Sequence, residues 1–339
     1  MKLLKIHLSV TLLHAWKAFL RGGNSGFKRS SKASSGCFNR MMNISKAIAS
    51  SVGNGIADDA LKDADNGFWL QALPQATQLA WQRRFYCIRW VDRLAEQDLI
   101  VQPDGQKFAA FRLAWQQLCR QGYLSDDLQQ WPVLQQLATD WFQTDPAGHQ
   151  AEIAAWDEYL AAIADYHQAH LVIASLRDYE VMLDRLAGSC FQLLPDLQVH
   201  QRAIARQFGW VDQFYNNLRD LYEDAQQGVC YFPTEVLTQF GLSRAAMLDL
   251  SCLQQPGYRH LMQFWVEDYL PQLRQQHLVL LQAEDLSPAW QRLTAWFGHR
   301  YRRIEQVMQD CDYDFVAFAQ QYWPLVAREL SIQPAARMS

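Results

Sequence analysis

From Asp58 onwards, apolar side chains recur every three or four residues almost without a break, and this spacing limits the possible folds more than any other feature. The 339 residues include only 16 Gly and 11 Pro, so residues that interrupt helices are scarce. Alternating β-branched segments bounded by turn residues, which are typical of strands, are nearly absent. The sequence therefore predicts an all-α protein.

The periodicity predicts ten helices separated by short segments with turn chemistry, such as "QPDGQ" (102–106), "DPAG" (145–148), "GVCYFPTE" (228–235) and "LSP" (286–288). The expected helices lie near 68–98, 106–121, 126–143, 149–175, 177–194, 198–227, 243–253, 257–277, 286–310 and 312–331. No repeat of fixed length is visible. One helical domain over 58–333, followed by a tail at 334–339, is the simplest organisation.

Residues 1–57 form a leader whose composition differs from the rest of the chain. They hold nine of the 31 Lys and Arg residues and no acid, and six of the eight lysines precede residue 47. Two explanations stay open: an organellar transit peptide, or a protein whose translation starts at Met41 or Met42, so that 1–41 are not translated. Either way we expect the leader to be disordered.

The body after the leader is acidic, with 22 basic residues against 35 acidic ones, a net charge of about −13. This balance argues against nucleic acid as a partner. The seven cysteines form no CxxC pair, which fits buried thiols in a reducing compartment. His167 and His170 have no Cys or further His nearby, so we expect them on a solvated helix face.

One predicted helix carries acids at a spacing that needs an explanation. In "FGWVDQFYNNLRDLYEDAQQGVCYFP" (208–233), Asp220 and Asp224 stand one turn apart, where like charges cost a few tenths of a kcal/mol. They share a polar face with Gln213, Asn216 and Asn217. Either this face is solvated, or a positive partner binds between the acids. If the acids line a cation-binding cavity, their repulsion is relieved only when the ligand binds, so neutralising Asp220 should stabilise the free protein; on a solvated face it should have almost no effect.

A second helix has a similar pair on an apolar side. In "WQRRFYCIRWVDRLAEQ" (81–97), Asp92 and Glu96 lie one turn apart near Phe85 and Ile88, beside Arg89. Carboxylates in such surroundings are rarely buried unless they are paired or bound to a metal. Arg89 could neutralise one of them. Alternatively, the two helices face each other across a cavity that holds Mg²⁺ through carboxylate oxygens.

The chain resembles the squalene/phytoene synthases, which join prenyl diphosphates head to head. The stretch 213–241 is similar to the family's second acidic motif at Gln213, Asn216, Arg219, Asp220, Glu223, Asp224, Gly228, Tyr231, Pro233, Phe240 and Gly241. "FYCIRWVDRLAEQ" (85–97) resembles the first motif more loosely, with Glu96 where aspartate is usual. "LDRLAGSC" (183–190) and "YRRIEQVMQDCDYDFVAF" (301–318) resemble two further segments. The resemblance covers about 68–331.

The resemblance implies a single helical bundle of the class I isoprenoid synthase type around a central cavity. It also implies that two allylic diphosphates, farnesyl or geranylgeranyl, condense with loss of diphosphate. The implied metal ligands and catalytic acids are Asp92, Glu96, Asp220 and Asp224, and the implied substrate-binding residues are Arg89, Gln213, Asn216, Arg219, Glu223 and Tyr231. Mg²⁺ is the implied ion, with Mn²⁺ as an alternative, and NADPH is needed only if the product is squalene.

The sequence departs from the family pattern at several positions. Arg93 stands where a second acid is usual, and Gln226, Gln227 and Val229 replace basic residues. Two alternatives therefore stay open. One is a family member that has lost catalysis and serves in binding or assembly. The other, which is less favoured, is an unrelated helical interaction protein. The apolar start of the leader is interrupted by Lys5 and Lys17, so it does not predict a membrane span. We expect a cytoplasmic or peripheral membrane protein without an obligate protein partner, or a plastid or other organellar one if the leader is a transit peptide.

Overall fold

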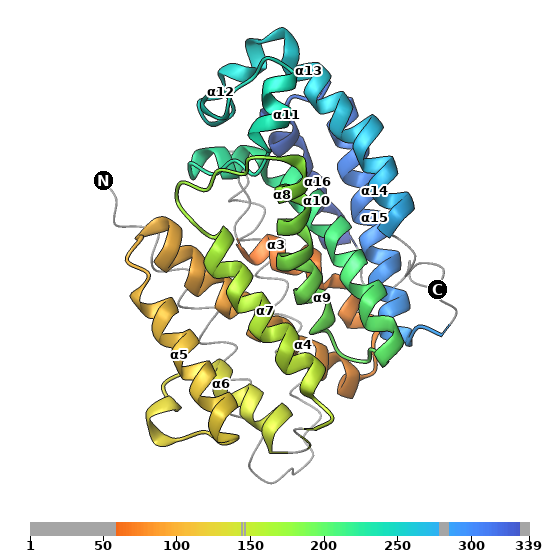
Figure 1. The fold of residues 1–339 in the computed structure, drawn as a ribbon. Helices are drawn as coiled ribbons and strands as arrows, with labels where there is room; N and C mark the ends of the chain where they lie inside the picture. The colour runs from red at the N-terminus through yellow and green to blue at the C-terminus, as the bar shows by residue number, and fades with distance from the viewer. Residues whose placement is uncertain (1–58, 144, 146, 278–284, 333–339) are drawn as a thin grey trace. The chain divides into compact units, whose positions relative to one another are not determined.

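The computed structural model describes residues 59–143, 145, 147–277 and 285–332. Every regular element in these ranges is helical, which confirms the all-α prediction (Figure 1). All of them belong to the unit Ile48–Ser339, which is distinct from the unit Met1–Ala47. The expected leader at 1–57 and tail at 334–339 fall outside the described residues.

The helices follow one another with short connections. The first half contains α3 (Asp59–Gly67), η3 (Phe68–Ala72), α4 (Gln75–Ala95), η4 (Glu96–Val101), α5 (Gln106–Gln121), η5 (Asp126–Leu128), α6 (Pro132–Leu137), η6 (Ala138–Phe142) and α7 (Gln150–Tyr166). The middle contains α8 (Leu176–Leu183), η7 (Asp184–Gly188), α9 (Ser189–Gln192), η8 (Val199–Gln201), α10 (Arg202–Gln226), α11 (Thr234–Gln239) and α12 (Arg244–Leu248). The last part contains η9 (Ser251–Gln254), α13 (Pro256–Gln263), η10 (Phe264–Tyr269), α14 (Leu270–His277), α15 (Pro288–Asp310) and α16 (Phe315–Ile332).

Two boundaries differ from the sequence prediction for identifiable reasons. The helix expected over 149–175 ends at Tyr166, where the backbone of His167 leaves the helical conformation, and Ser175 starts a new helix with a capping box to Asp178. The connection between them is held from a distance, since the backbone N–H groups of Thr234 and Glu235 donate to the carbonyls of Ile173 and Ala174 at 2.9 and 3.0 Å. Residues 234–239, partly expected as a loop, form α11.

Helix α10 is surrounded by other helices and carries the second acidic motif. It contacts η7, α9, α16, α14, α15 and α8. Gly209 permits the close approach to η7, because a Cβ there would lie 2.3 Å from the carbonyl oxygen of Ala187. Tyr215 stacks on Tyr301 of α15 with ring centroids 4.0 Å apart. These contacts leave little freedom for the position of the acids further along the helix.

Helix α3, which the sequence did not predict, is fixed by a buried ion network. Asp65 is 1% exposed and accepts hydrogen bonds from Arg303 Nη2 at 2.8 and 2.7 Å and from Arg300 Nε at 3.2 Å. Its carbonyl oxygen accepts from the indole of Trp296 at 2.6 Å. All three donors lie on α15, so α3 has a defined place beside that helix.

None of the described helices combines the length and apolar character needed to span a bilayer.

Candidate active site

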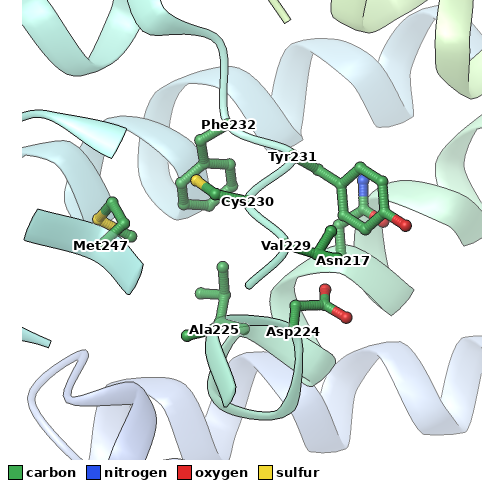
Figure 2. Close-up of a pocket in the computed structure, with 9 residues that line it drawn as sticks. Asn217, Asp224, Ala225, Val229, Cys230, Tyr231, Phe232 and Met247 are labelled. Carbon is green, nitrogen blue, oxygen red and sulfur yellow. The ribbon is translucent and has the colours of Figure 1, made fainter. Parts of the chain in front are cut away.

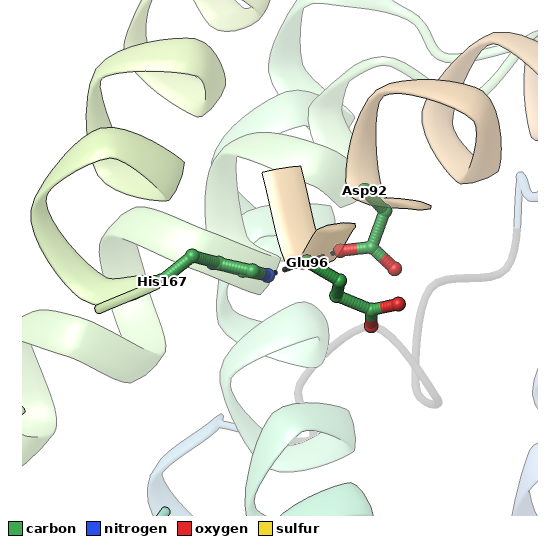
Figure 3. A group of neighbouring side chains, drawn as sticks. All are labelled: Asp92, Glu96 and His167. Atoms are coloured by element: carbon green, nitrogen blue, oxygen red, sulfur yellow. Dashed lines mark hydrogen bonds and ion pairs between the residues drawn. The ribbon is translucent and has the colours of Figure 1, made fainter. Parts of the chain in front are cut away.

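The first acidic motif lies at the junction of α4 and η4. Asp92 is on the last turn of α4 and Glu96 is the first residue of η4. His167, directly after α7, points its imidazole toward both (Figure 3). Its Nε2 lies 3.2 Å from Asp92 Oδ1, and one ligand atom from each of the three residues lies within 4.8 Å of the others. Carboxylate oxygens and imidazole nitrogen at such spacing fit a single divalent cation.

Asp92 is held in its charged form by Arg89 and by a hydrogen bond with His167. Burial alone would favour the neutral acid, but the hydrogen bond from His167 and the charge of Arg89 lower the pKa of Asp92 to about 2. Arg89 Nη1 donates to Asp92, and its Nε donates to Asp63 of α3 at 2.9 Å. Arg93, one residue after Asp92, also pairs with Asp63.

The second acidic motif is already partly neutralised within the chain. Arg219 donates two hydrogen bonds to Asp220, at 2.9 and 2.6 Å. Lys62 of α3 places its Nζ 3.5 Å from Asp220 Oδ1 and 2.6 Å from Glu223 Oε2. Burial would raise the pKa of Asp220, but the charges of Arg219 and Lys62 outweigh it and hold that pKa well below its ordinary value.

Asp224 has the opposite electrostatic character one turn further on. Burial and the neighbouring charge of Asp220 raise its pKa well above the ordinary value. Among the described residues, none donates a hydrogen bond to its carboxylate, which faces a small cavity whose walls include Val229, Tyr231 and Met247 (Figure 2). The cavity measures about 10 Å³, roughly the space of one water molecule.

The two acidic motifs come together around Tyr231. Burial raises the pKa of its hydroxyl well above the ordinary value, and four nearby carboxylates raise it further. These are, in order of decreasing effect, Asp224, Glu96, Asp92 and Asp220. The side chains of Asp92 and Asp220 are only 19% and 17% exposed. The solvated-face interpretation of the acids is therefore wrong.

The amide side chains of α10 form hydrogen bonds with other side chains of the protein. Gln213 donates to Asn217 at 2.9 Å, and Asn217 donates to the hydroxyl of Tyr179 at 2.9 Å. Asn217 is 3% exposed, which corrects its expected place on the polar face. Asn216 donates to Asp212 at 3.0 Å, while its own Oδ1 is buried without a hydrogen-bond partner in the described part of the chain.

Three residues of the site were missed by sequence reasoning. His167 was expected on a solvated face, yet its side chain is only 12% exposed and contacts Asp92. Lys62 and Asp63 precede every recognised motif; the partners of Asp63 lie 26 and 30 positions further on, and Glu223, a partner of Lys62, lies 161 positions further on. One compositional signal could have indicated Lys62: it is one of only two lysines after residue 46.

Comparison with known proteins identifies the family and a similar fold. The family model described as squalene/phytoene synthase matches residues 69–329, so the chain belongs to the squalene/phytoene synthase family. The fold is similar to that of a dehydrosqualene synthase crystallised with a ligand, with a TM-score of 0.60 and 16% sequence identity over 87% of this chain and 98% of that one. At that identity the likeness concerns the fold alone. A search among curated proteins found no match.

Proposed function

We propose that the protein is a prenyltransferase that joins two allylic diphosphates, farnesyl or geranylgeranyl, head to head. The observation that carries this proposal is the grouping of Asp92, Glu96 and His167 within 4.8 Å, together with Tyr231, which lines one cavity with Asp224 and senses the charges of both motifs. Such a reaction must bind two polyanionic diphosphates side by side, and it needs positive charge at both. The family to which the chain belongs supports the same class of reaction.

The first motif is suited to hold a divalent cation, Mg²⁺ or Mn²⁺, through Asp92, Glu96 and His167. Such an ion neutralises a leaving diphosphate as its C–O bond breaks. An imidazole ligand favours Mn²⁺ over Mg²⁺, since Mg²⁺ prefers oxygen ligands. Arg89 and Asp63 fix the orientation of Asp92 for this task.

Other side chains are suited to the carbocation that remains after diphosphate leaves. The raised pKa of Tyr231 keeps its phenol neutral, so it presents no phenolate oxygen that could trap the cation. Aromatic faces attract cations, and the ring of Tyr231 lies beside Asp224 (Figure 2). Each diphosphate leaves with the electron pair of its C–O bond. The first cation adds to the double bond of the second prenyl unit, and one proton is lost. After the second diphosphate leaves, loss of another proton completes an unsaturated product, whereas hydride from NADPH would complete squalene.

Prenyl binding requires the apolar wall beside Asp224 to rearrange. Its cavity of about 10 Å³ is far smaller than the several hundred Å³ typical of sites for molecules of this size. The wall includes Met247, whose flexible side chain can adopt other rotamers. We therefore expect substrate to bind with displacement of this lining.

The proposal is tested by thermal unfolding with Mg²⁺ or Mn²⁺ and a non-hydrolysable farnesyl diphosphate analogue. At about a hundredfold its Kd, the analogue should stabilise the wild type by roughly 2.7 kcal/mol. Asp92→Asn should reduce this gain, whereas Asp104→Asn, at an exposed position outside the site, should keep it. No stabilisation of the wild type would refute the proposal. A member without catalysis would be stabilised but would release no pyrophosphate from farnesyl diphosphate.

A further inference from the structure

We propose that Lys62 takes the place of a divalent cation at the second acidic motif, so that this motif binds no metal ion in the wild-type protein. This inference rests on the proposed function, because it concerns how the same site obtains its positive charge. It assigns a diphosphate-binding role to a residue of α3, a helix that precedes the region matched by the family model.

The contacts of Lys62 are those of a counter-ion within the motif. Its ammonium lies 2.6 Å from Glu223 Oε2 and 3.5 Å from Asp220 Oδ1, and its side chain is 13% exposed. The ammonium also lies 5.8 Å from the ring centroid of Trp323, a buried residue. A metal ion bound by Asp220 would have to approach this ammonium closely, and the repulsion between the two cations would oppose it.

Helix α3 holds Lys62 firmly in this place. The next residue, Asp63, pairs with Arg89 and Arg93 of α4. Asp65 is bound by Arg300 and Arg303 of α15 in the buried network. Adjacent residues of α3 thus place a cation against the acids of α10 and an anion against the arginines of α4. Because Lys62 is paired with Glu223 and the next residue, Asp63, with Arg89 and Arg93, Lys62 is part of the site in the substrate-free protein.

The consequence is an asymmetric site. One diphosphate would bind through a divalent ion at Asp92, Glu96 and His167. The other would meet the ammonium of Lys62 and the guanidinium of Arg219, groups that bind phosphate oxygens by charge-assisted hydrogen bonds. The protein would then bind one metal ion in total, whereas a protein whose second motif had unpaired acids would bind more than one.

The inference is tested by counting bound Mn²⁺, from the electron paramagnetic resonance signal of the free ion during titration of the full-length protein. The wild type should bind one ion, and Lys62→Gln should bind two. Lys62→Arg keeps the positive charge and should bind one. Lys107→Gln removes an exposed lysine on α5 and should also bind one. Unfolding curves of each variant establish that the counts refer to folded protein.

Two ions in the wild type, or no additional ion in folded Lys62→Gln, would overturn the inference. If Lys62→Gln does not fold, the decision rests on the wild-type count and on Lys62→Arg, where a second ion would equally overturn it. The first motif is tested separately by Asp92→Asn, which should bind no ion. If the wild type binds no ion and Lys62→Gln binds one, the proposed metal site at the first motif is contradicted, while the role of Lys62 is supported.

Discussion

Asp220 and Asp224 lie one helical turn apart, yet their environments shift their pKa values in opposite directions. Arg219 and Lys62 stabilise the charged form of Asp220 against the effect of burial, whereas burial and the charge of Asp220 disfavour the charged form of Asp224. Mutual repulsion alone predicted that neutralising Asp220 would stabilise the free protein. Because Arg219 and Lys62 stabilise the charge of Asp220, neutralising Asp220 should destabilise the free protein. The repulsion between the two acids instead favours the neutral form of Asp224.

Asp220→Asn should therefore destabilise the metal-free protein by roughly 1–3 kcal/mol near pH 7, since charged partners lose their acceptor. Asp220 has a lowered folded pKa, so its contribution is present above its unfolded pKa of about 3.9 and is lost as the pH falls below it. Asp224→Asn should behave differently. Because the folded pKa of Asp224 is raised, its contribution to the free energy of unfolding is lost as the pH rises through that pKa. The asparagine of Asp224→Asn does not ionise, so the variant does not show this loss.

Denaturant unfolding between pH 2 and 8 in a chelating buffer measures both effects. The free-energy deficit of Asp220→Asn should stay nearly constant from pH 8 to about pH 4 and shrink below it. The free energy of unfolding of Asp224→Asn, relative to the wild type, should increase toward pH 8. Equal behaviour of the two variants across this range would show that Lys62 and Arg219 do not neutralise Asp220 in solution.

At the scale of the elements, helical spacing was informative wherever an apolar stripe was long. It predicted the helix over 198–227, observed as α10 with η8 before it, and the i, i+4 acids that this helix carries. It missed α3, because "DALKDADNG" has few apolar residues to show a period. The place of α3 depends on partners such as Arg303, 238 residues after Asp65, and local spacing carries no information about such contacts.

The same limit applies to the site. The sequence motif identified Asp92, Glu96, Asp220 and Asp224 as a group, whereas the contact between His167 and Asp92 joins residues 75 positions apart. Lys62 and Glu223 are 161 positions apart. These residues have no regular spacing relative to the motifs, so only the folded arrangement reveals them.

If α3 is anchored by Asp65, then Asp65→Asn should destabilise the protein by about 3–5 kcal/mol, because it leaves Arg300 and Arg303 buried without their anionic partner. Denaturant unfolding near pH 7 measures this loss. Asp104→Asn, an exposed position, should stay within about 0.5 kcal/mol of the wild type. A similarly small change for Asp65→Asn would indicate that α3 is held by other contacts.

At the scale of the whole molecule, membership of the squalene/phytoene synthase family supports the proposed class of reaction but names no product. The helices bring two acidic motifs, from the first and second halves of the body, around one tyrosine. The likeness to a dehydrosqualene synthase at 16% identity concerns the fold, so the length of the prenyl chains has to be determined by experiment.

The most direct test of the proposed head-to-head reaction is the ratio of pyrophosphate released to lipid formed. Purified protein would be incubated with farnesyl or geranylgeranyl diphosphate and Mg²⁺ or Mn²⁺, with and without NADPH. Pyrophosphate and extracted lipids would then be quantified together. We predict two pyrophosphates for each hydrocarbon that contains two prenyl units. One pyrophosphate for each prenyl alcohol, or no release with either metal ion, would contradict the proposed reaction.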